Sequence, residues 1–396
     1  MSNKLWESAS GPELNPIVEK YTVGDDVWLD AVLLGWDIKA SIAHAKMLGQ
    51  CGLLSKSETT ALVAALKQLK AEWKKGSFVI KPGVEDGHSA IEAYVIEQVG
   101  DAGKKIHTAR SRNDQSLVMM RLYMKDSLEL VQRGLASVAY QLQQKSRATS
   151  AVPMPGYTHT QKAMPSTVSA WLMSYHDAFT DIQLLLEATH HYIDQNPLGS
   201  AAGYGVDLPI RRDLTTKALG FGKTQQNPLY CGMSRGLFEQ SVVQAYALLM
   251  TVAGKFANDM ILFTTEEFNF MSLPDEYTTG SSIMPHKRNY DVFEVMRAHA
   301  HMYSTYTGQI AAVATGVGSG YHRDYQLMKK PLYMATTILI ETLDVLTATI
   351  PEIIMHSAAL KKAITSDMQS VSEVNRLVRQ GVAFRDAYQK VKERYQ

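Results

Sequence analysis

The sequence is short of cysteine, has almost no excess of either charge and contains no long uninterrupted apolar run. Its two cysteines, Cys51 and Cys231, are too few for a disulfide framework and lack metal-ligand spacing, which is typical of a reducing compartment. Lysine and arginine together number 40, against 39 aspartates and glutamates. This balance gives no reason to expect nucleic acid or an acidic membrane surface as a partner.

Several motifs are also missing. The N-terminus lacks the apolar stretch of a signal peptide, and the apolar run at 245–253 stops at Lys255, well short of a membrane span. There is no glycine-rich phosphate fingerprint after a strand, no metal-spaced set of His, Cys and carboxylates, and no Gly-x-Ser-x-Gly elbow. We therefore expect a soluble cytoplasmic protein with no membrane contact, and metal-dependent hydrolysis and nucleotide-driven transfer are disfavoured.

Helix-breaking residues are scarce in the middle of the chain, where apolar residues recur at intervals of three and four. This pattern predicts long helices over 116–147, 166–195, 236–270, 291–314 and 331–350. Helices of this length are typical of a bundle. The segment 236–270 is apolar on more than one face, which predicts a homo-oligomer in which the second face meets another subunit.

Shorter segments flank this bundle. The first twenty-five or so residues contain glycine and proline and are expected to be extended. Apolar spacing predicts a helix over 30–48, and the run from Ser55 to Glu58 is a capping signal for the next helix. We therefore divide the chain into an N-terminal helical domain (1–108), a central bundle (109–356) and a short C-terminal helical domain (357–396).

A polar loop interrupts the helical pattern at Gly280-Ser281-Ser282-Ile283-Met284-Pro285-His286-Lys287-Arg288-Asn289. A Gly-Ser loop can move, and its backbone N–H groups are free to meet an anion. Lys287 adds a positive charge and Asn289 a neutral donor, so the loop suits a carboxylate or a phosphate. For the first three residues alone, an ordinary surface connection is the alternative.

Four more polar stretches lie where helices are expected to begin or end, at 85–88, 107–115, 156–161 and 320–329. The second places Arg112 at a helix start, where a guanidinium can hold a carboxylate bidentately. The third holds His159 in a turn between prolines, a fair position for an acid or base. Each stretch alone has a plainer interpretation: a helix cap at 85–88, a capped, solvated turn at 107–115, a hydrogen-bonded loop histidine at 156–161 and a charged helix entry at 320–329. Together they indicate a site for carboxylates and proton transfer.

These strings carry a resemblance to a known family. The loop from Gly280 to Asn289 resembles the signature Gly-Ser-Ser-x-Met-Pro-x-Lys-x-Asn of the fumarase/aspartase superfamily. One branch of that superfamily, the argininosuccinate lyases, is similar to this chain in four further places. These are the strings at 111–115 and 156–159, the opening Lys4-Leu5-Trp6 and the ending at 381–387. The resemblance covers essentially the whole chain.

The resemblance implies an all-α fold. In this family a central five-helix bundle forms a twenty-helix core in a homotetramer, flanked by small N- and C-terminal helical domains. Each active site draws on three subunits. The implied activity is the reversible β-elimination of argininosuccinate to arginine and fumarate, a step of arginine biosynthesis on a small-molecule substrate that uses no metal and no organic cofactor.

The resemblance also implies roles for catalytic residues. Ser281 matches the proposed base, which the loop must activate because a serine hydroxyl is a poor base at neutral pH. His159 would protonate the leaving guanidinium nitrogen or relay that proton, and Glu294 matches the carboxylate that pairs with this histidine and raises its pKa. Lys287 and Asn289 would hold the carboxylate whose charge increases in the transition state.

The implied substrate-binding residues form two groups. The carboxylates of the fumarate half would be fixed by Arg112, Asn113 and Thr158, with Ser111 beside them. The arginine half would face Tyr321, Gln326, Lys329 and Asp30.

The chain also departs from the family pattern. Tyr290 replaces the proline that usually follows the loop asparagine, and the usual serine is absent around Asp25 and Asp26. These departures keep open a lyase for another N-substituted aspartate. A crystallin-like structural protein is a further alternative, which the intact Ser281 and His159 disfavour because a structural role does not require them.

Overall fold

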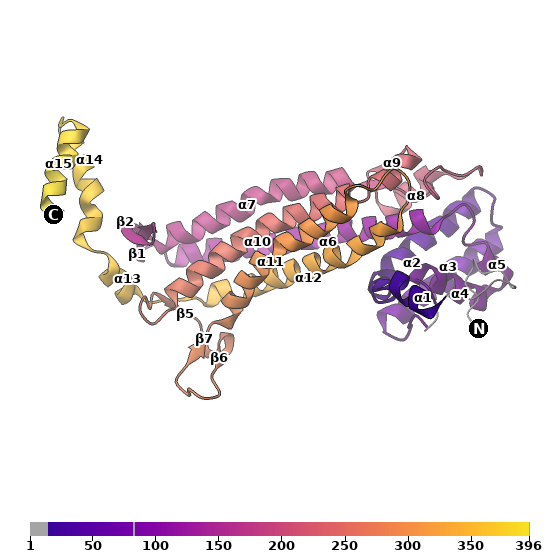
Figure 1. Ribbon diagram of the computed structural model, residues 1–396, viewed down its shortest axis with the longest axis horizontal. Helices are drawn as coiled ribbons and strands as arrows, with labels where there is room; N and C mark the ends of the chain where they lie inside the picture. The colour runs from indigo at the N-terminus through magenta and orange to yellow at the C-terminus, as the bar shows by residue number, and fades with distance from the viewer. Residues whose placement is uncertain (1–14, 82–83, 396) are drawn as a thin grey trace. The chain divides into compact units, whose positions relative to one another are not determined.

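The structure is a computed structural model that describes residues 15–81 and 84–395 (Figure 1). The five long segments are helices: α6 (Arg112–Ala148), α7 (Val168–Ile193), α10 (Leu237–Phe263), α11 (Asp291–Ala314) and α12 (Lys329–Thr349). The all-α fold class is confirmed.

One long helix is shorter than its apolar pattern indicated. We predicted a helix to residue 270, but α10 ends at Phe263. The hydroxyls of Thr264 and Thr265 bond back to the carbonyls of Met260 and Leu262, at 2.7 and 2.8 Å. Threonine hydroxyls compete in this way with the backbone at helix ends.

The chain forms two compact units. The first contains Met1–Leu130, Leu185–Tyr246 and Ser304–Thr337, and the second contains Val131–Leu184, Ala247–Tyr303 and Ile338–Gln396. Each of the five long helices has residues in both units. The division into domains at residues 108 and 356 follows the chain and not the packing, and it stays a prediction.

In the first unit, four helices pack around an apolar core: α2 (Asp26–Gln50), α3 (Lys56–Lys74), α4 (Gly87–Val99) and α8 (Arg212–Leu219). The unit also contains the shorter α1 (Pro16–Val23), α5 (Asp101–Lys104) and α9 (Pro228–Met233). The core contains Leu34 and Ile38 of α2, Leu62 and Leu66 of α3, and Ile91 of α4. The spacing of these residues by threes and fours brings them to one face of each helix.

Two predictions for the N-terminal part of the chain have different outcomes. The capping signal is confirmed, because Ser55 and Glu58 exchange backbone and side-chain hydrogen bonds at the start of α3. The extended start is wrong from Pro16 onward, where α1 begins. Asn15 caps this helix by accepting from the N–H of Ile17, and a proline in the first turn suits a helix start. Residues 1–14 lie outside the described residues.

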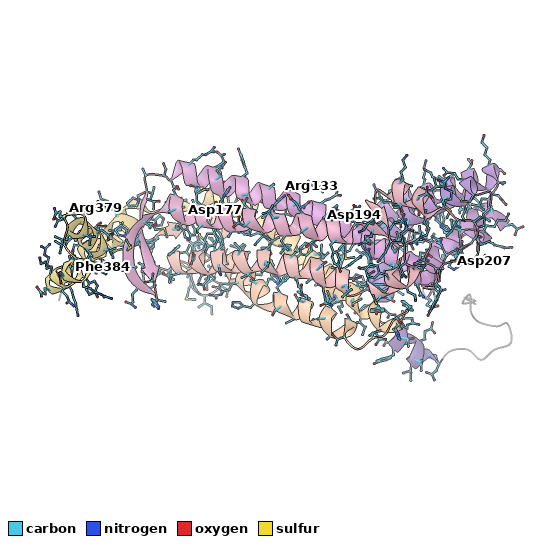
Figure 2. All side chains as sticks on the ribbon, turned by 90° about the horizontal axis from the view of Figure 1, so that it is seen from above. Arg133, Asp177, Asp194, Asp207, Arg379 and Phe384 are labelled. Carbon is cyan, nitrogen blue, oxygen red and sulfur yellow. The ribbon has the colours of Figure 1, made fainter. Side chains whose placement is uncertain are left out.

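The second unit carries two hairpins and the C-terminal helices. Strands β1 (Pro153–Thr158) and β2 (Gln161–Thr167) pair antiparallel, and so do the short β6 (Thr279–Gly280) and β7 (Arg288–Asn289). The chain then ends in α13 (Ser357–Ala363), α14 (Ser370–Arg379) and α15 (Phe384–Tyr395), the last two meeting near Arg379 and Phe384 (Figure 2).

Short elements complete the structure. Two further strand pairs join β3 (Gln195–Asn196) to β4 (Lys223–Thr224) and β5 (Met271–Ser272) to β8 (Ile354–Met355). The 3-10 turns are η1 (Asp275–Tyr277), η2 (Arg323–Met328), η3 (Ile350–Glu352) and η4 (Ser366–Gln369).

Two helical segments are apolar over a greater length than the run at 245–253 indicated. By length and composition alone, Pro228–Phe263 and Arg323–Glu352 could cross a membrane, with mean hydropathies of 1.2 and 1.3 over their best windows. About half of each window, 44% and 50%, is buried inside the chain. The core helix of a soluble bundle has the same length and composition, so this finding is weak evidence for a membrane span.

Candidate functional site

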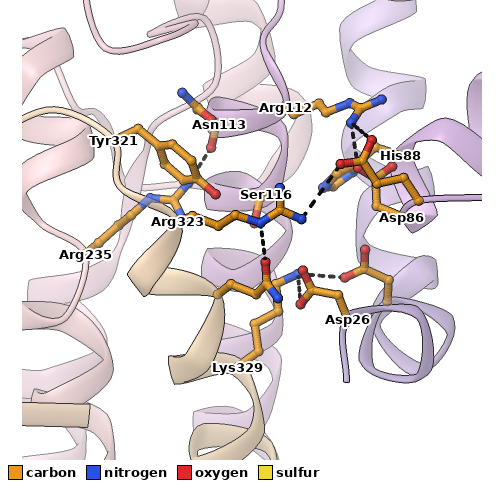
Figure 3. Close-up of a pocket in the computed structure, with 13 residues that line it drawn as sticks. Asp26, Asp86, His88, Arg112, Asn113, Ser116, Arg235, Tyr321, Arg323 and Lys329 are labelled. Carbon is orange, nitrogen blue, oxygen red and sulfur yellow. Dashed lines mark hydrogen bonds and ion pairs between the residues drawn. The ribbon is translucent and has the colours of Figure 1, made fainter. Parts of the chain in front are cut away.

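A polar cavity of about 180 Å³ lies in the first unit (Figure 3). Its walls come from the start of α2, the segment leading into α4, the start of α6, and the residues around η2 and the start of α12. Six of the residues predicted to bind substrate line it: Asp30, Arg112, Asn113, Tyr321, Gln326 and Lys329.

Lys329 is the centre of one wall of this cavity. Its ammonium donates to Asp26 Oδ1 at 3.0 Å and to Asp30 Oδ1 at 2.9 Å. The two aspartates lie on the same face of α2 because they are four residues apart. Burial alone lowers the pKa of Lys329, but the charges of Asp30 and Asp26 outweigh it and raise that pKa above its ordinary value. The lysine therefore stays charged.

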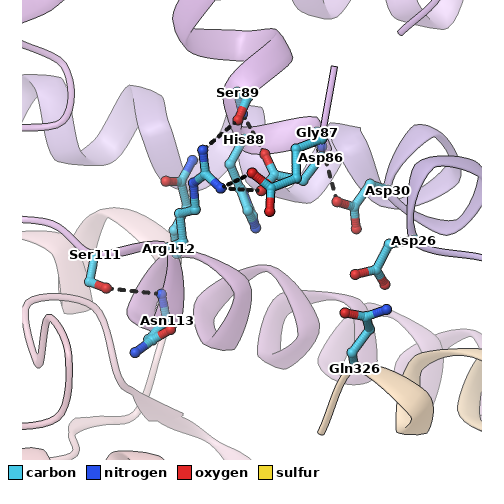
Figure 4. Close-up of polar contacts among 12 residues, drawn as sticks. Asp26, Asp30, Asp86, Gly87, His88, Ser89, Ser111, Arg112, Asn113 and Gln326 are labelled. Atoms are coloured by element: carbon cyan, nitrogen blue, oxygen red, sulfur yellow. Dashed lines mark hydrogen bonds and ion pairs between the residues drawn. The ribbon is translucent and has the colours of Figure 1, made fainter. Parts of the chain in front are cut away.

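The two aspartates differ in their remaining contacts. The second oxygen of Asp30 accepts from the backbone N–H of Gly87 at 3.0 Å (Figure 4). For Asp26, burial raises the pKa to about 6, the charge of Lys329 opposes this shift and the charge of Asp30 adds to it. Two carboxylates therefore share one ammonium on this wall of the cavity.

Arg112 is fully engaged by acidic neighbours on the opposite side of the cavity. One terminal nitrogen donates to Glu85 at 2.8 Å and lies 3.2 Å from a carboxylate oxygen of Asp86, and the other donates to Ser89 Oγ at 2.9 Å (Figure 4). Burial alone lowers the pKa of Arg112, but Asp86 and Glu85 raise it overall. In this structure the guanidinium holds the start of α4 against the start of α6, and its contact with a substrate carboxylate stays a prediction.

The neighbours of Arg112 are fixed by a residue that the sequence did not single out. The buried carboxylate of Asp114 accepts from the N–H of Ser111 at 2.9 Å and from those of Gly199 and Ala201 at 2.8 and 3.0 Å. Ser111 Oγ in turn accepts from the N–H of Asn113 at 3.3 Å. Asp114 thus joins the start of α6 to a loop more than eighty residues away in sequence. The polar string at 111–115 contains this aspartate, but spacing gives no sign of its distant partners.

Arg235 is another cavity residue that the sequence did not indicate. Its guanidinium donates to the carbonyl of Asn113 at 2.6 Å and lies over the rings of Tyr321 and Tyr325, at 4.9 and 5.7 Å. These contacts fix the ring of Tyr321, which was predicted to face the substrate. A single arginine before a long helix carries no distinguishing pattern, so only the packing identifies it.

A buried histidine lines the cavity beside these groups. His88 Nδ1 lies 2.5 Å from Asp37 Oδ2, and the amide of Gln115 donates to the same carboxylate at 3.0 and 3.2 Å. Burial alone lowers the pKa of His88, but the charge of Asp37 and the hydrogen bond to it raise this pKa to about 8. The histidine therefore carries a proton near neutral pH.

The polar loop at 280–289 forms the hairpin between β6 and β7 in the second unit. Ser281 Oγ accepts hydrogen bonds from the backbone N–H groups of Ile283 and Met284, at 3.3 and 3.1 Å. Lys287 is exposed, and Asn289 pairs with Thr279 across the hairpin. The hairpin therefore brings together three predicted residues, Ser281, Lys287 and Asn289.

Two more predicted residues lie at the tip of the other hairpin. Thr158 ends β1, and the exposed His159 follows it in a left-handed conformation with φ of 53°. Thr160 has φ of 62°, so both central residues of this tight turn are left-handed, as in a type I′ hairpin. Glu294 is exposed in the first turn of α11.

The family model and the similar sequences that match this chain are all lyases. Residues 17–302 match the model of a family described as lyase. The argininosuccinate lyase of Bacteroides fragilis is 42% identical over 391 residues, which cover 99% of this chain and 87% of the relative. The argininosuccinate lyase of Thermotoga neapolitana is 40% identical over 395 residues, which cover 100% of this chain and 99% of the relative. That of Stenotrophomonas maltophilia is 41% identical over 389 residues, which cover 98% of this chain and 90% of the relative.

Solved structures share the fold at lower identity. A variant of EDDS lyase with bound fumarate superposes with a TM-score of 0.81 at 20% identity, covering 97% of this chain and 76% of that one. The class II fumarase of Schistosoma mansoni gives 0.78 at 15% identity, covering 94% and 91%. At these identities the likeness shows the fold.

Proposed function

Because the chain belongs to the lyase family that includes the argininosuccinate lyases, we propose that it catalyses the reversible β-elimination of argininosuccinate to arginine and fumarate. The observation that carries this proposal is identity of 40% or more with argininosuccinate lyases over nearly the whole chain. The cavity of the first unit supports it, because carboxylates and cationic side chains both line it, and an amino acid carries charged groups of both signs.

The proposed first step is the removal of a proton from the carbon next to a carboxylate. Ser281 is the proposed base. Its oxygen already accepts from two backbone N–H groups, and such donors stabilise the alkoxide that a serine base requires. Lys287 and Asn289, in the same hairpin, would hold the substrate carboxylate that gains negative charge in the transition state.

The leaving nitrogen must gain a proton as its bond to carbon breaks. His159 is the proposed donor or relay, with Glu294 as its partner. Thr158, Ser111, Arg112 and Asn113 are proposed to fix the fumarate half. Arg112 would then meet a substrate carboxylate only by sharing or exchanging its contacts with Glu85 and Asp86.

A homotetramer with shared active sites is also proposed. Its support is the large apolar residues that remain exposed on the long helices of one chain: Leu184, Leu185, Leu248, Leu262, Val295 and Met302. Exposed apolar helix faces of this kind are typical of interfaces between subunits. The three-part domain division and a cytoplasmic location are part of the same proposal.

A lyase for another N-substituted aspartate is the second candidate. It is favoured by Asp26, which stands in the stretch where the family's usual serine is missing and which lines the cavity. Incubation of the purified protein with argininosuccinate, followed by ultraviolet absorbance, tests the choice. Fumarate formation supports the first candidate, and fumarate from a different aspartate adduct alone supports the second.

The catalytic assignment is tested by Ser281→Ala, with Ser282→Ala in the same loop as the matched control. We expect the first variant to keep its fold and assembly and to lose turnover by orders of magnitude, while the control keeps its turnover. Near-normal turnover of Ser281→Ala contradicts the base assignment. Mixed Ser281→Ala and His159→Asn subunits are expected to regain some activity if sites are shared, and no recovery after verified exchange counts against sharing.

A further inference from the structure

The hairpin of β6 and β7, which carries three of the proposed active-site residues, has a weak framework of its own. It projects from the second unit beside the start of α11 (Figure 1). Its strands are two residues long and pair Thr279 with Asn289 and Gly280 with Arg288. A two-stranded hairpin is at best marginally stable in water by itself. The position of the loop at 281–287 therefore depends on how the hairpin is attached to the rest of the unit.

Within residues 15–81 and 84–395, two side-chain hydrogen bonds or ion pairs attach the hairpin to its surroundings. The hydroxyl of Thr279 donates to Oδ2 of Asp291, in the first turn of α11. Arg288 Nε lies 3.5 Å from Asp275 Oδ1, but these side chains are 48% and 84% exposed, and an exposed pair of this kind contributes little. A hydrogen bond to a charged acceptor is stronger than one between neutral groups. The bond between Thr279 and Asp291 is therefore the firmer attachment.

This bond closes the open end of the hairpin. Thr279 is the first residue of β6 and pairs with Asn289, the last residue of β7. Asp291 then begins α11. The bond therefore joins the strand that enters the hairpin to the helix that follows the strand that leaves it. The two backbone N–H groups that donate to Ser281 Oγ lie inside the loop, so they fix the serine relative to its neighbours but not relative to α11.

The link between β7 and α11 has little stiffness of its own in this chain. Tyr290 stands where a proline usually follows the loop asparagine. A proline fixes its own φ and restricts the residue before it to extended conformations. Asn289 has an extended conformation in β7 without this restraint. Its orientation therefore depends more strongly on the bond between Thr279 and Asp291.

We propose that Thr279 and Asp291 are positioning residues of the lyase, whose bond holds the hairpin so that Ser281 and Asn289 keep the places that proton removal requires. This inference rests on the proposed function. Removal of a proton needs the base and the groups that bind the carboxylate in exact mutual positions, and a displacement of about 1 Å can lower a rate about 100-fold. Neither positioning residue needs to touch the substrate.

Removal of the Thr279 hydroxyl tests the proposal and leaves Asp291 in place at the start of α11, where a negative charge also suits the helix dipole. Thr279→Val keeps the branched shape and removes the donor, whereas Thr279→Ser keeps the donor. Thr278→Val is the matched control, because the Thr278 hydroxyl donates to the carbonyl of Asp275 at 2.8 Å and not to α11. Each chain is measured by kcat and KM for fumarate release from argininosuccinate, and by amide hydrogen exchange over 279–289.

We expect Thr279→Val to lower kcat roughly 10- to 100-fold. KM should change little, because Thr279 is not itself a contact of the substrate. Amide exchange over 279–289 should become roughly 3- to 10-fold faster, the effect of losing one exposed hydrogen bond to a charged group. Thr279→Ser and Thr278→Val should match the unmodified chain in turnover and in exchange.

A proline at position 290 offers a rescue by a different route. In the described part of the chain no acceptor is recorded for the N–H of Tyr290, so Tyr290→Pro removes no hydrogen bond there. The proline would restrict Asn289 to the extended conformation that it has in β7. In the Thr279→Val chain we expect Tyr290→Pro to restore part of kcat and to slow the exchange again. A hydroxyl that only stabilised the fold would give no such recovery of turnover.

The proposal is overturned if Thr279→Val keeps the kcat and the exchange of the unmodified chain, or if Thr279→Ser loses as much turnover as Thr279→Val. It is also overturned if Tyr290→Pro slows the exchange of the Thr279→Val chain without any recovery of turnover. If the unmodified chain releases no fumarate from argininosuccinate, the proposed function fails. Exchange over 279–289 then still tests the attachment: faster exchange in Thr279→Val alone supports it, and equal exchange in all the chains refutes it.

Discussion

Replacement of Asp26 by asparagine is expected to stabilise the fold. The carboxyl of Asp26 has its pKa raised from 3.8 to about 6 by burial, with the charge of Asp30 adding to the shift. A raised carboxyl pKa means that the folded state prefers the protonated form. The stability contributed by that form is fully present below pH 3.8 and is lost as pH rises through about 6.

The size of the effect follows from this shift. The difference between about 6 and 3.8 corresponds to about 3 kcal/mol, which is the largest gain in unfolding free energy that asparagine can give at pH 8. Asparagine has the shape of the protonated acid, and Lys329 keeps Asp30 as its partner at 2.9 Å. The gain should therefore appear at pH 8 and shrink toward zero at pH 4.

Chemical denaturation at both pH values measures the change, with Asp25→Asn as the control. Its exposed pair with Lys330 should contribute no more than about 1 kcal/mol at either pH. An Asp26→Asn variant that is less stable than the unmodified chain at pH 8, or equally stabilised at pH 4 and pH 8, refutes the reasoning.

Two further predictions concern the same cavity. Lys329→Met leaves two carboxylates of the wall without their ammonium and should lower the unfolding free energy by about 3–5 kcal/mol at pH 8, measured by denaturation against the exposed Lys330→Met. For His88, whose pKa is raised from 6.5 to about 8, the added stability is present below pH 6.5 and lost as pH rises through 8, by up to about 2 kcal/mol. Thermal melts between pH 6 and pH 9.5 should show this decline in the unmodified chain and not in His88→Gln, and a flat profile in both would contradict it.

Periodicity predicted the long helices well because it depends only on neighbours in the sequence. The segment 291–314 coincides with α11, and the capping signal at Ser55 marks the start of α3. The prediction of the N-terminal segment was wrong because two local signals compete there. A proline and a glycine suggested an extended start, yet Pro16 begins α1 because a proline is favourable in the first turn of a helix.

The candidate site was only partly visible in the sequence. Its residues were found through strings that resemble a family, and Tyr321, Gln326 and Lys329 do line one cavity with Asp30. Arg235 and Asp114 were missed, because their roles lie in contacts with a distant ring and with distant backbone N–H groups. No spacing rule reports such contacts.

The sequence by itself determined the helical class, the family and the residue types available for proton transfer and carboxylate binding. Those properties follow from periodicity and from strings of adjacent residues. Only the tertiary structure decided which charges meet: Lys329 lies against Asp30, 299 positions earlier in the chain, and Arg112 against Glu85. Since the pKa of each group depends on burial and on charges within a few ångströms, the raised pKa of Asp26 exists only in the folded chain.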